Sequence, residues 1–149
     1  MSVHSQQNNM RRLYELLSQN LSYIWGDKEC GPNGAKKTFL NVGKVFLRAL
    51  GKDLGLRDVV VKSNAGGIAM SGECTLIGMW EDSGIYICIE QPACCGEDVI
   101  YYRTVRSIKD YRGGYNHFVR LSELQSMPYE QLLRRLGALR QDVGYARAA

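Results

Sequence analysis

The chain has 149 residues, 45% of them hydrophobic, and a formal net charge of +4. This length is enough for one domain with its own core, and the mild positive charge permits an anionic partner without requiring one. No apolar run approaches the ~20 residues of a membrane-spanning helix, which argues against an integral membrane protein.

The N-terminal third of the chain predicts two helices. Leucines and Ile24 recur at helical spacing over residues 10–25, after a polar stretch (residues 1–9) that we expect to be flexible. A clearer apolar stripe, which includes Phe39 and Phe46, predicts a second helix over residues 35–54. Gly43 lies in this stripe. Because glycine destabilises a helix by about 1 kcal/mol relative to alanine, we expect another element to approach it closely.

The middle of the chain changes to strand periodicity. Four strands are predicted, at residues 58–62, 68–80, 85–90 and 99–106. In the third strand, Ile85, Ile87 and Ile89 alternate with more polar residues, as expected when one face of a sheet is buried. Short connections favour an antiparallel meander, to which residues 118–121 could add a short extension.

The C-terminal part predicts one helix. We expect it to begin near Pro128, which is favoured in a first turn, and to end near Gly144, with residues 145–149 flexible. Ser122 and Gln125 resemble a capping box. The prediction is therefore a single α+β domain over residues 1–149, with two N-terminal helices, a four-stranded antiparallel sheet and a C-terminal helix.

The sequence lacks the motifs of several common enzyme classes. It has no C-x-x-C pair for zinc, no phosphate-binding G-x-x-x-x-G-K-[ST] or G-x-G-x-x-G, and no G-x-S-x-G. We therefore predict no catalytic residue, no metal and no cofactor. Five cysteines and a start without the features of a signal peptide predict free thiols in the cytoplasm.

One segment, residues 103–120, has a functional pattern. Five basic residues stand there against one acid, interleaved with tyrosine and phenylalanine. Arginine binds phosphate or carboxylate, aromatic rings stack on bases, and both are enriched at protein interfaces. We predict a binding module for a protein partner or a nucleic acid. The predicted ligand-binding residues are Arg103, Arg106, Lys109, Tyr111, Arg112, Asn116 and His117.

Three alternatives stay open at this point. The same pattern is typical of a solvated loop without function. A small nucleotide-binding protein or enzyme could use Asp110 and His117 with Cys94 or Cys95. A structural protein could also form a homodimer by pairing the edge strands of its sheet.

A resemblance adds a biological setting. Lys109-Asp110-Tyr111 with Gly113-Gly114 and Asn116, and Ala65-Gly66-Gly67 followed by Ser71-Gly72-Glu73, resemble small uncharacterised proteins carried on phages and other mobile elements of bacteria. The resemblance spans residues 35–116. It implies an accessory protein that binds a component of the host or the element, and that could counter a defence system. It carries over no catalytic residue.

Overall fold

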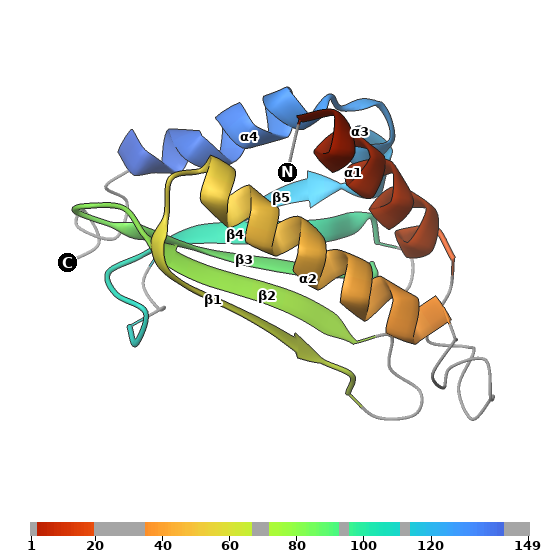
Figure 1. Cartoon of the computed structure of the whole chain (residues 1–149), viewed down its shortest axis with the longest axis horizontal. Coiled ribbons are helices and arrows are strands. Elements are labelled where there is room, and N and C mark those ends of the chain that lie inside the picture. The colour runs from red at the N-terminus through yellow and green to blue at the C-terminus, as the bar shows by residue number, and fades with distance from the viewer. Residues whose placement is uncertain (1–2, 20–34, 67–71, 93–95, 111–113, 142–149) are drawn as a thin grey trace.

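The computed structural model describes residues 3–19, 35–66, 72–92, 96–110 and 114–141. These residues form two layers, in which helices pack on one face of an antiparallel sheet with strand order β1-β2-β3-β4-β5 (Figure 1). The elements are α1 (Val3–Leu17), α2 (Ala35–Asp53), β1 (Arg57–Asn64), β2 (Glu73–Met79), β3 (Gly84–Glu90), β4 (Asp98–Val105), β5 (His117–Arg120), α3 (Leu121–Ser126), α4 (Tyr129–Gly137) and the 3-10 turn η3 (Ala138–Gln141).

The α+β prediction is confirmed, with five strands instead of four. The additional strand, β5, pairs antiparallel with β4, so that Val119 lies opposite Ile100 and is buried in the core. A strand of four residues is too short to show a periodic pattern of its own. Its pairing with β4 therefore comes from the tertiary structure.

The start of the first helix was predicted wrongly. Helix α1 begins at Val3, well before Met10, because its polar first turns are held by the rest of the fold. Gln6 is fully buried, and its Nε2 donates a hydrogen bond to the Phe46 carbonyl oxygen over 3.2 Å. The described helix ends at Leu17, and the expected end at residue 25 lies outside the described residues.

The C-terminal region contains two helices where one was predicted. Helix α3 follows β5 directly, and its first turn is closed by Glu123, whose Oε1 accepts a hydrogen bond from the Arg120 backbone N–H over 3.0 Å. The capping residues are therefore not Ser122 and Gln125. Helix α4 begins after Pro128, as predicted, but it ends at Gly137, where the 3-10 turn η3 takes over, and so stops short of the expected end near Gly144.

Helix α2 packs against strands β1 and β2, and it approaches β2 most closely at Gly43. A Cβ atom on this glycine would lie 2.5 Å from the Cys74 Sγ of β2, which is closer than van der Waals contact allows. The expected close approach to Gly43 is thus confirmed. On either side of it, Phe39 and Phe46 are completely buried.

Polar contacts join the C-terminal helices to α2 and to strand β5, on the face of the sheet that the helices cover. The Tyr129 hydroxyl donates a hydrogen bond to Asp53 Oδ2 at the end of α2 (2.6 Å), and the Tyr129 ring meets Phe46 edge-on at 6.0 Å. Arg135 of α4 bonds Glu123 of α3 (2.7 Å) and the carbonyl oxygen of Phe118 in β5 (2.6 Å). These contacts hold α3, α4 and the β5 edge together.

The described helices differ from membrane-spanning helices. None of them combines the length and the apolar character that crossing a bilayer requires.

Replacing Gly43 by alanine tests the packing of α2 on β2. We expect the free energy of unfolding to fall by about 1 kcal/mol, because overpacking costs roughly 1–3 kcal/mol while alanine gains about 1 kcal/mol of helix propensity. In a Cys74→Ala background, which removes the obstructing sulfur, Gly43→Ala should be neutral or stabilising. Chemical denaturation measures the free energy of unfolding of the unaltered protein, the two single variants and the double variant. An equal cost of Gly43→Ala with and without Cys74→Ala would contradict this prediction.

Candidate functional site

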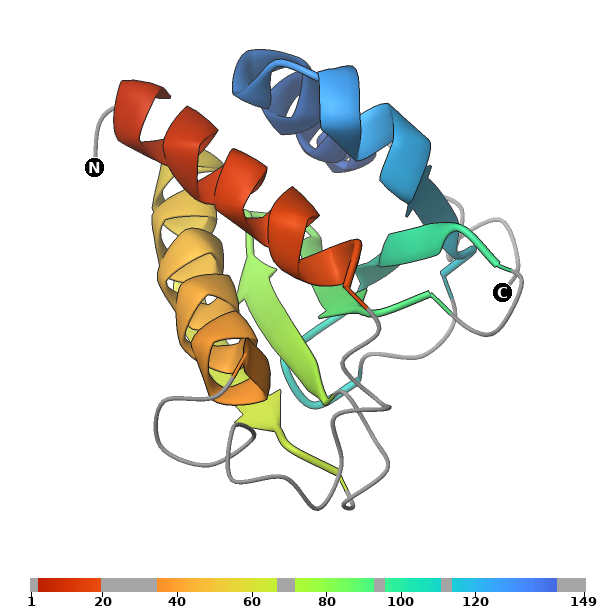
Figure 2. The same cartoon turned by 90° about the vertical axis from the view of Figure 1, so that its right-hand side faces the viewer.

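The α-helices that the structure describes leave one face of the sheet open. They lie together on the opposite face, and within the described part of the chain no helix crosses this one (Figures 1 and 2). Strand side chains alternate between faces, so the strand register identifies those on the open face. The side chains on it include Val60, Lys62, Glu73, Thr75, Ile77, Tyr86, Cys88, Glu90, Tyr101, Arg103 and Phe118.

Three aromatic rings form a row across neighbouring strands on this face. Tyr86 of β3 lies 6.1 Å from Tyr101 of β4, and Tyr101 lies 6.4 Å from Phe118 of β5, measured between ring centroids. Phe118, at the edge of the sheet, is 44% exposed. We call Tyr86, Tyr101 and Phe118 the aromatic row. It offers apolar ring surface to a ligand lying on the sheet.

Arg103 stands beside the aromatic row. The carbon of its guanidinium group lies 4.9 Å from the centroid of the Tyr86 ring, a cation–π contact. Its Nη1 also donates a hydrogen bond to Asn116 Oδ1 over 3.2 Å. The structure thus brings together two of the predicted site residues, Arg103 and Asn116, and orients the guanidinium group from two sides.

The segment after β4 folds back over the open face. The Arg106 N–H donates to the Asp110 carbonyl oxygen (3.3 Å), and the Ser107 Oγ accepts the N–H groups of Lys109 (3.3 Å) and Asp110 (3.0 Å). This turn bounds a cleft of about 350 Å³ against β1, β2 and β3, which we call the loop cleft. The described residues that line it are Val60, Lys62, Thr75, Ile77, Tyr86, Ile108 and Lys109.

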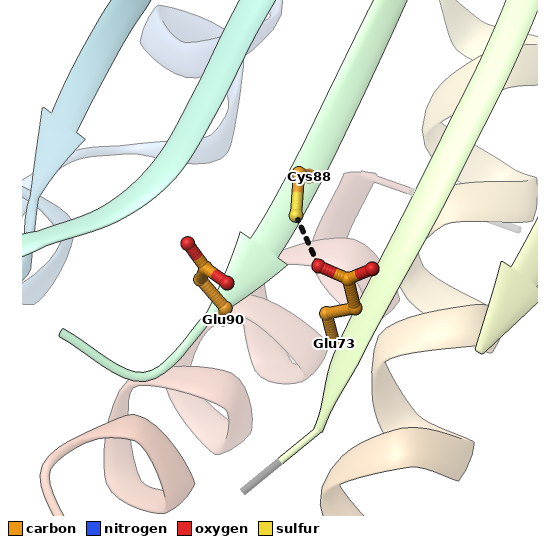
Figure 3. Close-up of side chains that lie close together, drawn as sticks. All are labelled: Glu73, Cys88 and Glu90. Carbon is orange, nitrogen blue, oxygen red and sulfur yellow. Dashed lines mark hydrogen bonds between the residues drawn. The ribbon is translucent and has the colours of Figure 1, made fainter. Parts of the chain in front are cut away.

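A thiol and two carboxylates meet at one end of the open face (Figure 3). One ligand atom from each of Glu73, Cys88 and Glu90 lies within 4.8 Å of the others, and the Cys88 thiol donates to Glu73 Oε2 over 3.5 Å. Burial raises the pKa of Cys88, and burial followed by the Glu73 charge raises that of Glu90. A metal could use these three donors. The arrangement as it stands is a protonated thiol bonded to an acid, and a closed zinc site takes four ligands.

The predicted site residues divide between the two faces. Arg103, Asn116 and Lys109 belong to the open side, and Arg106 is exposed at the start of the turn. His117 lies on the covered side, where its ring stacks on Tyr102 with centroids 5.2 Å apart and an interplanar angle of 23°. The remaining two, Tyr111 and Arg112, lie outside the described residues.

The enzyme alternative required a histidine beside a thiol and an acid. His117 faces the helices, whereas the turn that carries Asp110 reaches the loop cleft on the opposite face through Ile108 and Lys109. The sheet therefore separates the imidazole from the cleft. Both thiols proposed for this site, Cys94 and Cys95, lie outside the described residues.

Several residues of the open face were not predicted as site residues. The alternation of residues 85–90 already placed Tyr86 opposite the buried isoleucines, and this signal could have identified it. Lys62 and Thr75 belong to β1 and β2, where they pair directly. Their position beside Lys109 depends on strand register and on the fold of the turn, which no local pattern indicates.

No known protein family, characterised protein or solved structure shows a significant match to this chain.

Thiol labelling tests the structure of the open face. Burial raises the pKa of Cys74 to about 12 and also raises that of Cys88, and both side chains are completely buried. We expect iodoacetamide at pH 8 to label neither residue in the native protein and both in denaturant, as mapped by mass spectrometry of peptides. Cys74, under the helices, is the internal control. Fast native labelling of Cys88 alone would show that the open face does not shield its thiol.

Proposed function

We propose that the protein is a non-enzymatic binding module whose open face binds single-stranded nucleic acid. The observation that carries this proposal is the aromatic row with Arg103 beside it, on a sheet face that no described helix covers. Sheet-based RNA-binding modules use the same chemistry, in which aromatic side chains on an antiparallel sheet stack two or three bases. The analogy concerns the surface and not the fold.

The geometry of the aromatic row suits stacked bases. Its three rings sit on consecutive strands, so that a single strand lying across the sheet would meet them in sequence. Phe118 has the most exposed ring surface of the row, and we expect it to contribute most to stacking. Stacking of a base on an aromatic side chain tolerates any sequence, because every base has a π face.

The charges on the open face are separated along the strands. Glu73 and Glu90 lie opposite each other at one end of the strands. Further along, Arg103 lies opposite Tyr86, and Lys109 of the turn lines the loop cleft together with Tyr86. A phosphate backbone is therefore attracted to the Arg103 end and repelled from the carboxylate end. This polarity orients a bound strand and makes its affinity depend on salt.

A protein partner is the second candidate. Val60 and Ile108 are apolar and about one-third exposed, at 37% and 38%, and arginine and tyrosine are common at protein interfaces. The accessory role on a mobile element, including action against a host defence system, stays a proposal that rests on the sequence resemblance. Location in the cytoplasm and homodimer formation likewise stay predictions.

Fluorescence anisotropy with short labelled single-stranded DNA and RNA tests the nucleic-acid proposal. We expect Phe118→Ala to weaken binding roughly tenfold or more, because one stacking platform is lost. Arg103→Gln should lower the slope of log affinity against log salt by about one, because one phosphate contact is lost.

Matched controls lie on the exposed side of α2, away from the open face. Arg48→Gln removes the same charge as Arg103→Gln, and Val45→Ala removes an apolar side chain that is 42% exposed. Both should bind like the unaltered protein. If the unaltered protein binds no single strand at low salt, or if Phe118→Ala binds as tightly as Val45→Ala, the proposal is wrong and a protein partner becomes the leading candidate.

A further inference from the structure

We propose that the loop cleft binds a small phosphate-bearing ligand with a flat apolar body, the chemical class of a nucleoside monophosphate. This site goes beyond the strand-binding surface proposed above, since neither Tyr101 nor Phe118 lines it. The two sites meet at Tyr86, which belongs to both.

The size and the walls of the cleft suit a small organic molecule. Its volume of about 350 Å³ lies within the range of roughly 300–1,000 Å³ that is common for small-molecule pockets. The turn between Ser107 and Asp110 forms one wall and three adjacent strands form the other. Because the Ser107 Oγ already holds two backbone N–H groups, the turn needs little further ordering when a ligand enters.

The apolar side chains of the cleft form a surface on which the flat ring of a ligand can pack. Val60 and Ile77 lie opposite each other on β1 and β2, Tyr86 continues the same row on β3, and Ile108 approaches from the turn. Val60 and Ile108 are 37% and 38% exposed. A base or other flat ring between them would remove this apolar surface from water, which favours binding.

The charged side chains of the cleft select an anion. Of the described residues that line it, Lys62 and Lys109 are the charged ones, and both are basic. Among the residues that the structure describes, no carboxylate lies within ion-pair distance of either ammonium group. Thr75, which pairs with Lys62, adds a hydroxyl group. Lysine binds phosphate as a point charge, so these three side chains can hold a phosphate group while the ring occupies the apolar part.

Isothermal titration calorimetry with AMP, GMP, CMP and UMP tests the proposal. Adenosine, which lacks the phosphate, and inorganic phosphate, which lacks the ring, are the comparison ligands. At least one monophosphate should bind more tightly than both of them. Lys62→Glu and Lys109→Glu should each weaken that binding at least tenfold, because an attraction becomes a repulsion. The matched control is Lys52→Glu on the exposed side of α2, which should bind as the unaltered protein does.

Three results would overturn the proposal. The first is that no monophosphate binds at millimolar concentration, and the second is that inorganic phosphate binds as tightly as the monophosphates, since the apolar walls then contribute nothing. The third is unchanged binding in the Lys62→Glu and Lys109→Glu proteins, which would place any ligand elsewhere. A backbone NMR spectrum of each variant establishes that it is folded.

Two further measurements separate this site from the strand-binding surface. Phe118→Ala should leave monophosphate affinity unchanged, so the two proposals can fail independently. A 5′-phosphorylated oligonucleotide is then compared with its 5′-hydroxyl form. Tighter binding of the phosphorylated form would identify the end of a strand as the source of the ligand, whereas equal binding would identify the free nucleotide.

Discussion

The contact between Gly43 of α2 and Cys74 of β2 is the constraint on which the rest of the structure depends. A glycine at this position lets the helix backbone lie directly on β2, and Phe39 and Phe46 then fill the space on either side. Helices α1, α3 and α4 complete the same layer (Figure 2). Because side chains alternate along each strand, covering one face in this way leaves the other face to interact with something else.

The open face has three parts, and strand register determines where each lies. Register places the two glutamates and Cys88 at one end, the aromatic row across β3 to β5, and the loop cleft over β1 to β3. Tyr86 lies where the row and the cleft meet, with Arg103 packed on its ring. A ligand in the cleft and a strand on the row would therefore occupy neighbouring halves of one surface, with the carboxylates repelling anions from the far end.

Much of the fold could be predicted, because long elements repeat their pattern. The stripe over residues 35–54 and the alternation over residues 85–90 correspond to α2 and β3. The errors arose where tertiary contacts prevail over a local pattern. The polar first turns of α1 are helical because Gln6 reaches the Phe46 carbonyl group, and β5 exists because Val119 has a place in the core.

The sequence by itself determined the α+β class, the antiparallel meander with one buried face, and the basic, aromatic character of residues 103–120. Only the tertiary structure decided which of those residues act together. A shift of one position separates His117, under the helices, from Phe118 on the open face. Arg103 contacts Tyr86 of β3, and Lys109 lines the same cleft as Lys62 of β1, so both act with residues of other strands. The physical reason is that periodicity specifies a face of one element, whereas a site is built from register and packing between elements.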